Sequence, residues 1–124
     1  MTPHRRTVLL VEDDAAIRRI AVRLLERAGL EVVQAGDGEE GLARWREHRD
    51  RIGVVVTDVM MPRLSGRDLI AAVLAEDQHV RFVLMTGLDS GDVPGDTAGI
   101  EILMKPWEGN ALLESVRRAL GEGA

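Results

Sequence analysis

The centre of the sequence is the stretch Val54-Val55-Val56-Thr57-Asp58-Val59-Met60-Met61-Pro62. Its three valines and one threonine form a short apolar, β-branched run, which is typical of a strand buried on both faces of a parallel sheet. Asp58 follows where this run ends, and Pro62 breaks the strand pattern soon afterwards. Aspartate is common in turns after strands, but open α/β sheets also bind their ligands at the carboxyl ends of their strands. Asp58 is therefore a candidate functional residue whose role depends on the rest of the chain.

The composition is that of an ordinary globular protein, with 124 residues of which 45% are hydrophobic and 30% charged. This length predicts a single domain over residues 1–124 with one core between about residues 7 and 120. The net charge of −5 gives no basis for direct nucleic-acid binding, and no apolar run is long enough to cross a membrane. There is no signal peptide pattern, and the absence of cysteine excludes disulfides, zinc–thiolate sites and thiol catalysis. We therefore expect a cytoplasmic protein.

Strand and helix patterns alternate along the chain. The predicted strands cover residues 7–11, 30–34, 52–57, 80–85 and 100–104. A first helix is predicted up to Gly29, with Asp13 or Asp14 as its cap and Ile17, Ile20, Ala21, Leu24, Leu25 and Ala28 on its apolar face. Further helices are predicted over residues 39–48 and over 110–120. Another is predicted to begin at the capping pattern Ser65-Gly66-Arg67-Asp68, with Leu69, Ile70, Val73 and Leu74 toward the core. Strands that alternate with helices predict an α/β fold with a doubly wound, five-stranded parallel sheet.

The segment between the fourth and fifth predicted strands departs from this pattern. Residues 87–99 contain four glycines and one proline, and both residue types disfavour a helix. We therefore expect a short or irregular fourth helix there, of at most one or two turns.

Polar side chains follow the predicted strands: Glu12 and Asp13 after the first, Asp58 after the third, Thr86 after the fourth and Lys105 after the fifth. The carboxyl ends of parallel strands lie along one edge, so these residues should share a cleft. Clustered carboxylates favour a hard divalent cation such as Mg²⁺, with Mn²⁺ as an alternative. An aspartate can accept a phosphoryl group, whose oxygens a lysine, a hydroxyl and backbone N–H groups near Val59 and Gly87 could bind. The pattern predicts metal-assisted phosphoryl transfer to Asp58.

Four motifs together resemble a known family. They are Val-Leu-Leu-Val-Glu-Asp-Asp (8–14), Val-Val-Thr-Asp-Val-Met-Met-Pro-Arg-Leu-Ser-Gly (55–66), Leu-Met-Thr-Gly (84–87) and Met-Lys-Pro-Trp (104–107). In this order, and across essentially the whole chain, they resemble the receiver domain of two-component response regulators. The resemblance implies a CheY-like, flavodoxin-like sheet with strand order 2-1-3-4-5, and phosphorelay signal transduction through an aspartyl phosphate.

The resemblance implies a role for each matching residue. Asp58 matches the phosphoacceptor, Thr86 the switch hydroxyl and Lys105 the lysine that binds the phosphoryl group. For the metal, Asp13 and Asp58 match carboxylate ligands, Glu12 an acid that acts through water, and Met60 a ligand through its backbone carbonyl. Pro106 matches a proline whose preceding peptide bond is usually cis, and Gly87 directly follows the switch residue.

Three departures from the family pattern affect the expected output. Ile102 stands where the family often has an aromatic side chain that moves inward after phosphorylation, so signalling through an aromatic rotamer is in question. The segment between Thr86 and Lys105 is shorter than usual, which should reshape the common output face. Trp107 replaces a more frequent phenylalanine, and we expect it to pack near the site and to respond to metal binding.

The expected function is a phosphorylation-dependent signalling module that is not an enzyme for other substrates. Its phosphoryl donor would be a histidine kinase or a histidine phosphotransfer protein. Since no output domain follows Leu120, it should act on an unidentified protein target by binding or phosphorelay, or be the receiver part of a hybrid histidine kinase. A phosphatase of the haloacid dehalogenase type uses similar residues, but it typically has an acid/base where this chain has Met60. A receiver-like binding module without phosphorylation is disfavoured by the complete set of acids, threonine and lysine.

Overall fold

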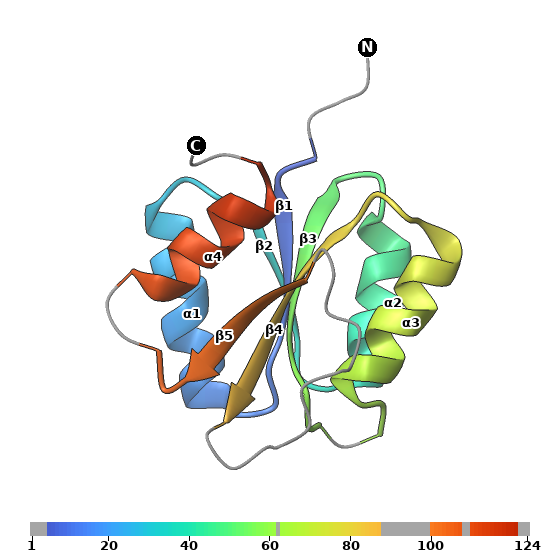
Figure 1. Cartoon of the computed structure of the whole chain (residues 1–124), viewed down its shortest axis with the longest axis horizontal. Helices are drawn as coiled ribbons and strands as arrows, with labels where there is room; N and C mark the ends of the chain where they lie inside the picture. Colours follow the sequence, from blue (N-terminus) through green and yellow to red (C-terminus); the bar gives the residue numbers. More distant parts are fainter. Residues whose placement is uncertain (1–4, 62, 88–99, 108–109, 122–124) are drawn as a thin grey trace.

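The computed structural model describes residues 5–61, 63–87, 100–107 and 110–121. Its strands are β1 (Thr7–Val11), β2 (Val32–Ala35), β3 (Ile52–Asp58), β4 (Arg81–Gly87) and β5 (Ile100–Lys105). They form one parallel sheet in the order β2-β1-β3-β4-β5 (Figure 1). The predicted doubly wound α/β fold and its strand order are therefore confirmed.

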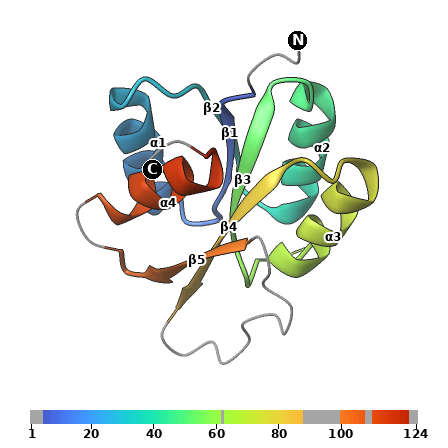
Figure 2. The same ribbon diagram turned by 45° about the horizontal axis from the view of Figure 1, so that its top comes forward.

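Helices cover both faces of the sheet. In the described part of the chain they are α1 (Ala15–Arg27), α2 (Gly38–His48), α3 (Gly66–Glu76) and α4 (Ala111–Ala119). The pair α1 and α4 lies on one face and the pair α2 and α3 on the other (Figure 1 and Figure 2). The short or irregular helix predicted between β4 and β5 falls on residues 88–99, outside the described residues. No helix in the described ranges is both long and apolar enough to cross a lipid bilayer.

The sheet separates two largely aliphatic cores. Successive residues of β1 point to opposite faces, so Val8 and Leu10 pack under α1 and α4, whereas Leu9 and Val11 pack under α2 and α3. Every residue of β1 is buried. Burial on both faces explains why the strands read as continuous apolar runs rather than as an alternation of apolar and polar residues.

Polar caps determine where two of the helices begin. The Asp14 carboxylate accepts hydrogen bonds from the N–H groups of Ala16 and Ile17 at 2.9 and 3.1 Å. The Ser65 hydroxyl accepts one from the Asp68 N–H at 3.2 Å, as the capping pattern predicted. Asp14 is therefore the cap of α1, and the neighbouring Asp13 carboxylate belongs to the edge of the sheet discussed below.

Three details differ from the sequence-based expectations. β2 begins at Val32 instead of residue 30, because the Leu30 N–H bonds to the Leu25 carbonyl and completes the end of α1. Ile20, expected in the core, is 59% exposed, and Leu74 of α3 is 38% exposed. Helical periodicity identifies the apolar side of a helix, but the neighbouring layer decides how much of that side is covered.

The start of α3 lies against the end of β3. The Gly66 N–H donates to the Val59 carbonyl at 2.9 Å, and a Cβ atom at Gly66 would collide with the carbonyl oxygen of Asp58. A Cβ atom at Gly38, the first residue of α2, would likewise collide with the backbone carbonyl of Leu64. Val59 thus lies against the first turn of α3, and Leu64 lies against the first turn of α2.

Replacing Gly66 with alanine should destabilise the protein, because the atoms it would meet are backbone atoms that cannot rotate away. We expect Gly66→Ala to lower the free energy of unfolding by about 2–4 kcal/mol in urea titrations followed by circular dichroism. The control is Gly36→Ala, whose Cβ would have ordinary contacts at 3.5 and 3.6 Å. We expect this control to stay within about 0.5 kcal/mol of the parent, and equal effects of the two substitutions would contradict the steric argument.

Candidate functional site

The carboxyl ends of four strands bring the predicted site residues to one edge of the sheet. Asp58 is the last residue of β3, Thr86 the next to last of β4 and Lys105 the last of β5. Glu12 and Asp13 directly follow β1. Parallel pairing in register places these strand ends side by side. The expectation that these residues share one region is therefore confirmed.

Most of this edge is shielded from water. Glu12, Asp58 and Thr86 are only 1%, 6% and 2% exposed, whereas Asp13 is exposed. The aliphatic strands and the two helix layers cause this burial. Carboxylates in such surroundings are unfavourable unless a cation and hydrogen bonds compensate for the lost water.

Lys105 supplies the compensating charge. Its Nζ lies 2.5 Å from Oε1 of Glu12 and 2.7 Å from Oδ1 of Asp58. One ammonium group thus joins the end of β5 to the ends of β1 and β3. This geometry needs the strand order of the sheet, because the residues are far apart in the sequence.

Glu12 is held in place by further contacts. Its Oε2 accepts a hydrogen bond from the Asp14 N–H at 3.0 Å, so both carboxylate oxygens have a partner. Arg18 of α1 donates from Nη1 to the Glu12 backbone carbonyl at 2.7 Å. Sequence reasoning missed Arg18, since no motif distinguishes it from the other arginines of α1.

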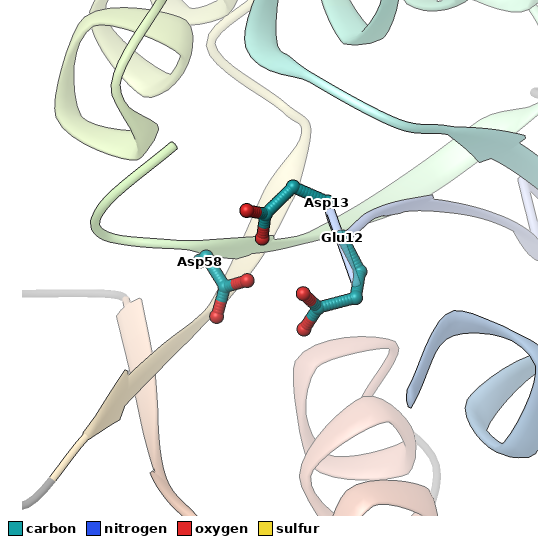
Figure 3. Close-up of side chains that lie close together, drawn as sticks. All are labelled: Glu12, Asp13 and Asp58. Carbon is teal, nitrogen blue, oxygen red and sulfur yellow. The ribbon is translucent and has the colours of Figure 1, made fainter. Parts of the chain in front are cut away.

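The three carboxylates form a group that fits a hard cation. Figure 3 shows the side chains of Glu12, Asp13 and Asp58 around one common space, and an oxygen of each lies within 4.8 Å of the others. Mg²⁺ takes oxygen ligands and retains several waters, and the exposure of Asp13 leaves one side open to solvent. The donor set therefore fits the metal that the sequence predicted.

The acids titrate differently because their surroundings differ. Burial, and then the hydrogen bond with Glu12, raises the pKa of Asp58 from its ordinary 3.8 to about 7, although Lys105 acts in the opposite direction. Burial also tends to raise the pKa of Glu12, but hydrogen bonds with Asp58 and Lys105 outweigh it and lower that pKa. Burial and the charge of Glu12 raise the pKa of Asp13. Without a bound cation, the cluster thus holds a proton near neutral pH, mainly on Asp58.

Three further positions named by the sequence analysis are Pro106, Ile102 and Val59. The Lys105–Pro106 bond is cis, as the resemblance implied. Ile102 packs against the core under α2 and α3. The Val59 N–H donates to the Met85 carbonyl at 3.1 Å. This donor is therefore already used, and the expectation that backbone N–H groups near Val59 and Gly87 help to bind an anion stays a prediction for the neighbouring groups.

Thr86 and Met60 were predicted to act through a hydroxyl and through a backbone carbonyl, respectively. Thr86 is buried, and its hydroxyl lies 3.4 Å from the Gly87 carbonyl, which is long for a hydrogen bond between oxygens. Met60, expected to offer its backbone carbonyl to a metal, has a side chain that is 70% exposed.

An apolar pocket of about 450 Å³ adjoins the cluster. It is lined by Lys105 together with Ile17, Ile20, Pro106 and Trp107. Trp107 is partly buried and packs against the core under α1 and α4. The indole thus shares a pocket with the lysine of the charged cluster, which agrees with the expectation that Trp107 lies near the site.

Comparison with known proteins shows which family and which relatives this chain is similar to. Residues 8–117 match the model of the family described as response regulator receiver domain. The C4-dicarboxylate transport transcriptional regulatory protein DctD of Pseudomonas aeruginosa is 36% identical over an alignment of 118 positions, which covers 91% of this chain and 25% of that protein. The curated relatives that it matches are longer, and the chain spans about a quarter to somewhat over half of their length.

Two solved structures show the likeness of the fold. A response regulator receiver domain protein from Clostridium thermocellum has a TM-score of 0.83 at 31% identity, covering 93% of this chain and 94% of its own. The receiver domain of the hybrid histidine kinase CckA has a TM-score of 0.79 at 31% identity, covering 92% and 98%.

The raised pKa of Asp58 predicts that an uncharged residue there stabilises the metal-free protein. The folded state retains the Asp58 proton up to about pH 7, whereas the unfolded chain releases it near 3.8, so this site makes unfolding easier as pH rises through that window. At pH 8 in EDTA we expect Asp58→Asn to raise the free energy of unfolding by about 1–3 kcal/mol, and we expect this gain to shrink toward pH 4.

The control for this prediction is Asp50→Asn, which removes a charge at an exposed aspartate outside the cluster. Urea titrations of parent and variants at several pH values measure the effect. An Asp58→Asn variant less stable than the parent at pH 8 would show that the pair with Lys105 outweighs burial and repulsion.

Proposed function

This chain belongs to the response regulator receiver family, and on that premise we propose that Asp58 accepts a phosphoryl group from the phosphohistidine of a histidine kinase or a histidine phosphotransfer protein. The observation that carries the proposal is the place of Asp58, which is buried, 2.7 Å from the Lys105 ammonium and grouped with two other carboxylates. A helix cap or a turn former would need none of these neighbours.

The transfer follows from the chemistry of the groups present. A carboxylate oxygen of Asp58 attacks the phosphorus, the P–N bond to the donor imidazole breaks, and its electron pair stays on the imidazole nitrogen, which then takes a proton. The product is an acyl phosphate on Asp58. A Mg²⁺ ion held by Asp13, Asp58 and the Met60 carbonyl, with Glu12 acting through water, would neutralise charge on the phosphoryl oxygens.

Lys105 and Thr86 would recognise the phosphoryl group once it is attached. The Lys105 ammonium already lies beside the Asp58 oxygens, so it can pair with a phosphoryl oxygen after a small shift. This shift weakens its contact with Glu12, and Thr86 on the adjacent strand supplies a hydroxyl donor. The phosphorylated state therefore redistributes the contacts between β1, β4 and β5, which biases two conformations of the domain.

We propose that this bias is transmitted by contact with another protein or by onward phosphoryl transfer, and that the domain catalyses only reactions of its own aspartyl phosphate. Ile102 is aliphatic and packed against the core, which supports an output that does not use a rotating aromatic side chain. The same chemistry applies whether the chain acts alone or as the receiver of a hybrid histidine kinase.

Incubation with acetyl phosphate or phosphoramidate and Mg²⁺ should add one phosphoryl group, detected by intact mass spectrometry. We expect the adduct in the parent and in Asp50→Asn, and its absence in Asp58→Asn and in samples with EDTA. An equal adduct on Asp58→Asn would place the modification elsewhere. Failure of the parent to react, with Mg²⁺ still bound, would favour a phosphorylation-independent binding module.

The position of Trp107 predicts a fluorescence response to the metal. Trp45 is completely buried and its Nε1 has no hydrogen-bond partner, so Trp45→Phe removes the second indole without breaking a hydrogen bond. In this background we expect Mg²⁺ to change the Trp107 emission along a saturable curve, because Lys105 lines the same pocket. A saturable signal that persists in a variant with both Asp13→Asn and Asp58→Asn would show that the response arises away from the cluster.

A further inference from the structure

Arg18 differs from the other arginines of α1 in where its side chain lies. Arg19, Arg23 and Arg27 are exposed, whereas Arg18 is half-buried and donates from Nη1 to the backbone carbonyl of Glu12 at 2.7 Å. Within the described residues Arg18 forms no ion pair, although the acidic cluster begins at Glu12 itself. An arginine that neutralises a carboxylate does so through direct, often paired, hydrogen bonds, so this contact with an uncharged carbonyl needs another explanation.

The contact closes a ring of hydrogen bonds at the start of α1. The Arg18 N–H donates to the Asp14 carbonyl at 2.9 Å, and the Asp14 N–H donates to Oε2 of Glu12 at 3.0 Å. The Arg18 guanidinium then returns to the backbone carbonyl of the same glutamate. Asp13 lies within this ring, between Glu12 and Asp14 in the sequence. The Arg18 side chain thus ties the first turn of α1 to the end of β1.

The ring holds both peptide groups that flank Asp13. The carbonyl of the first, between Glu12 and Asp13, accepts a hydrogen bond from Arg18. The N–H of the second, between Asp13 and Asp14, donates to the Glu12 carboxylate. Peptide groups are planar, so their orientations set the two backbone torsion angles of Asp13 and hence the direction of its Cα–Cβ bond. Packing contributes little to this direction, because Asp13 is exposed.

The direction of the Asp13 side chain matters because three carboxylates share one space. Figure 3 shows Asp13 directed toward the same space as Glu12 and Asp58, and an oxygen of each lies within 4.8 Å of the others. Glu12 and Asp58 are held by burial and by Lys105, whereas Asp13 depends on its backbone. Residues that orient a metal ligand without touching the metal commonly change metal affinity about 10- to 100-fold.

We propose that Arg18 is a positioning residue for the metal site: its hydrogen bond to the Glu12 carbonyl orients Asp13 as a ligand of Mg²⁺. The sign of the effect separates positioning from charge. A guanidinium near the cluster repels a cation, so by charge alone the loss of Arg18 would tighten Mg²⁺ binding. Positioning predicts the opposite, because an Asp13 side chain without a fixed direction is a poorer ligand.

A matched pair of variants tests the proposal. Arg18→Met removes the guanidinium and keeps an unbranched apolar stem, and Arg19→Met removes the same charge from the neighbouring, exposed position. Titration of isotope-labelled protein with magnesium chloride, followed by NMR, measures the dissociation constant. We expect Arg18→Met to raise it about tenfold and Arg19→Met to change it less than about twofold. Arg18→Lys, which keeps a donor for the carbonyl, should bind Mg²⁺ more nearly as the parent does.

Two further readouts distinguish positioning from a general loss of structure. In the metal-free protein, the nitrogen chemical shift of the Asp13 amide reports the hydrogen bond to the carbonyl of the same peptide group. We expect Arg18→Met to move it and Arg19→Met to leave it unchanged. With acetyl phosphate, the Mg²⁺ concentration that gives half the maximal rate should rise about tenfold in Arg18→Met, and the rate at saturating Mg²⁺ should change less than about threefold. If Arg18→Met fails to fold by circular dichroism, Arg18→Gln takes its place.

Three results would overturn the proposal. They are Mg²⁺ binding by Arg18→Met that is as tight as in the parent or tighter, equal weakening in Arg19→Met, and an Asp13 amide shift that does not respond to Arg18→Met. The inference rests on the proposed function, but the two can fail separately. A parent that binds Mg²⁺ and forms no phosphoryl adduct refutes phosphorylation at Asp58 and leaves the Mg²⁺ titration as the test of Arg18. A normal adduct with unchanged Mg²⁺ binding in Arg18→Met refutes the role of Arg18 alone.

Discussion

The ammonium group of Lys105 is placed between Glu12 and Asp58, and this pair of contacts determines how the functional edge is built. Two carboxylates that are almost completely buried repel each other strongly when no cation lies between them. The lysine reaches both because β1, β3, β4 and β5 end along one edge in that order. The sheet thus brings two repelling carboxylates together, and it also places the lysine that partly neutralises them.

One lysine does not neutralise three carboxylates. The excess negative charge can be balanced by a proton or by a bound cation. In the metal-free protein the cluster holds a proton close to neutral pH, which the raised pKa of Asp58 expresses. A divalent cation can take the place of that proton, since Asp13 keeps one side of the group open to water. If Asp58 is phosphorylated as proposed, the phosphoryl group would be a new partner for Lys105 and would compete with its contact to Glu12.

The surroundings of the cluster differ between the two faces of the sheet. On the side of α2 and α3, the backbone of Asp58 lies against Gly66 and that of Leu64 against Gly38, so neither glycine has room for a side chain. On the side of α1 and α4, the apolar side chains of Ile17, Ile20 and Trp107 line a pocket together with Lys105. The charged cluster is thus bordered by an apolar surface on this side.

The local pattern was sufficient to predict the strands to within two residues, the caps of α1 and α3 and the five polar residues at the strand ends. This is because β-branched runs, capping side chains and breakers act over a few neighbouring residues. The family motifs then supplied the strand order and the cis bond before Pro106. Other features depend on residues that are distant in the sequence: the reach of Lys105 to Glu12, the contact of Arg18 with the Glu12 carbonyl, the use of the Val59 N–H by Met85, and the exposure of Ile20. Periodicity marks the apolar side of a helix, but only the packing of α4 against α1 determines how much of it water reaches. Likewise, carboxylates can be recognised from their spacing, whereas their pKa values follow from burial and neighbours that exist only after the sheet has formed.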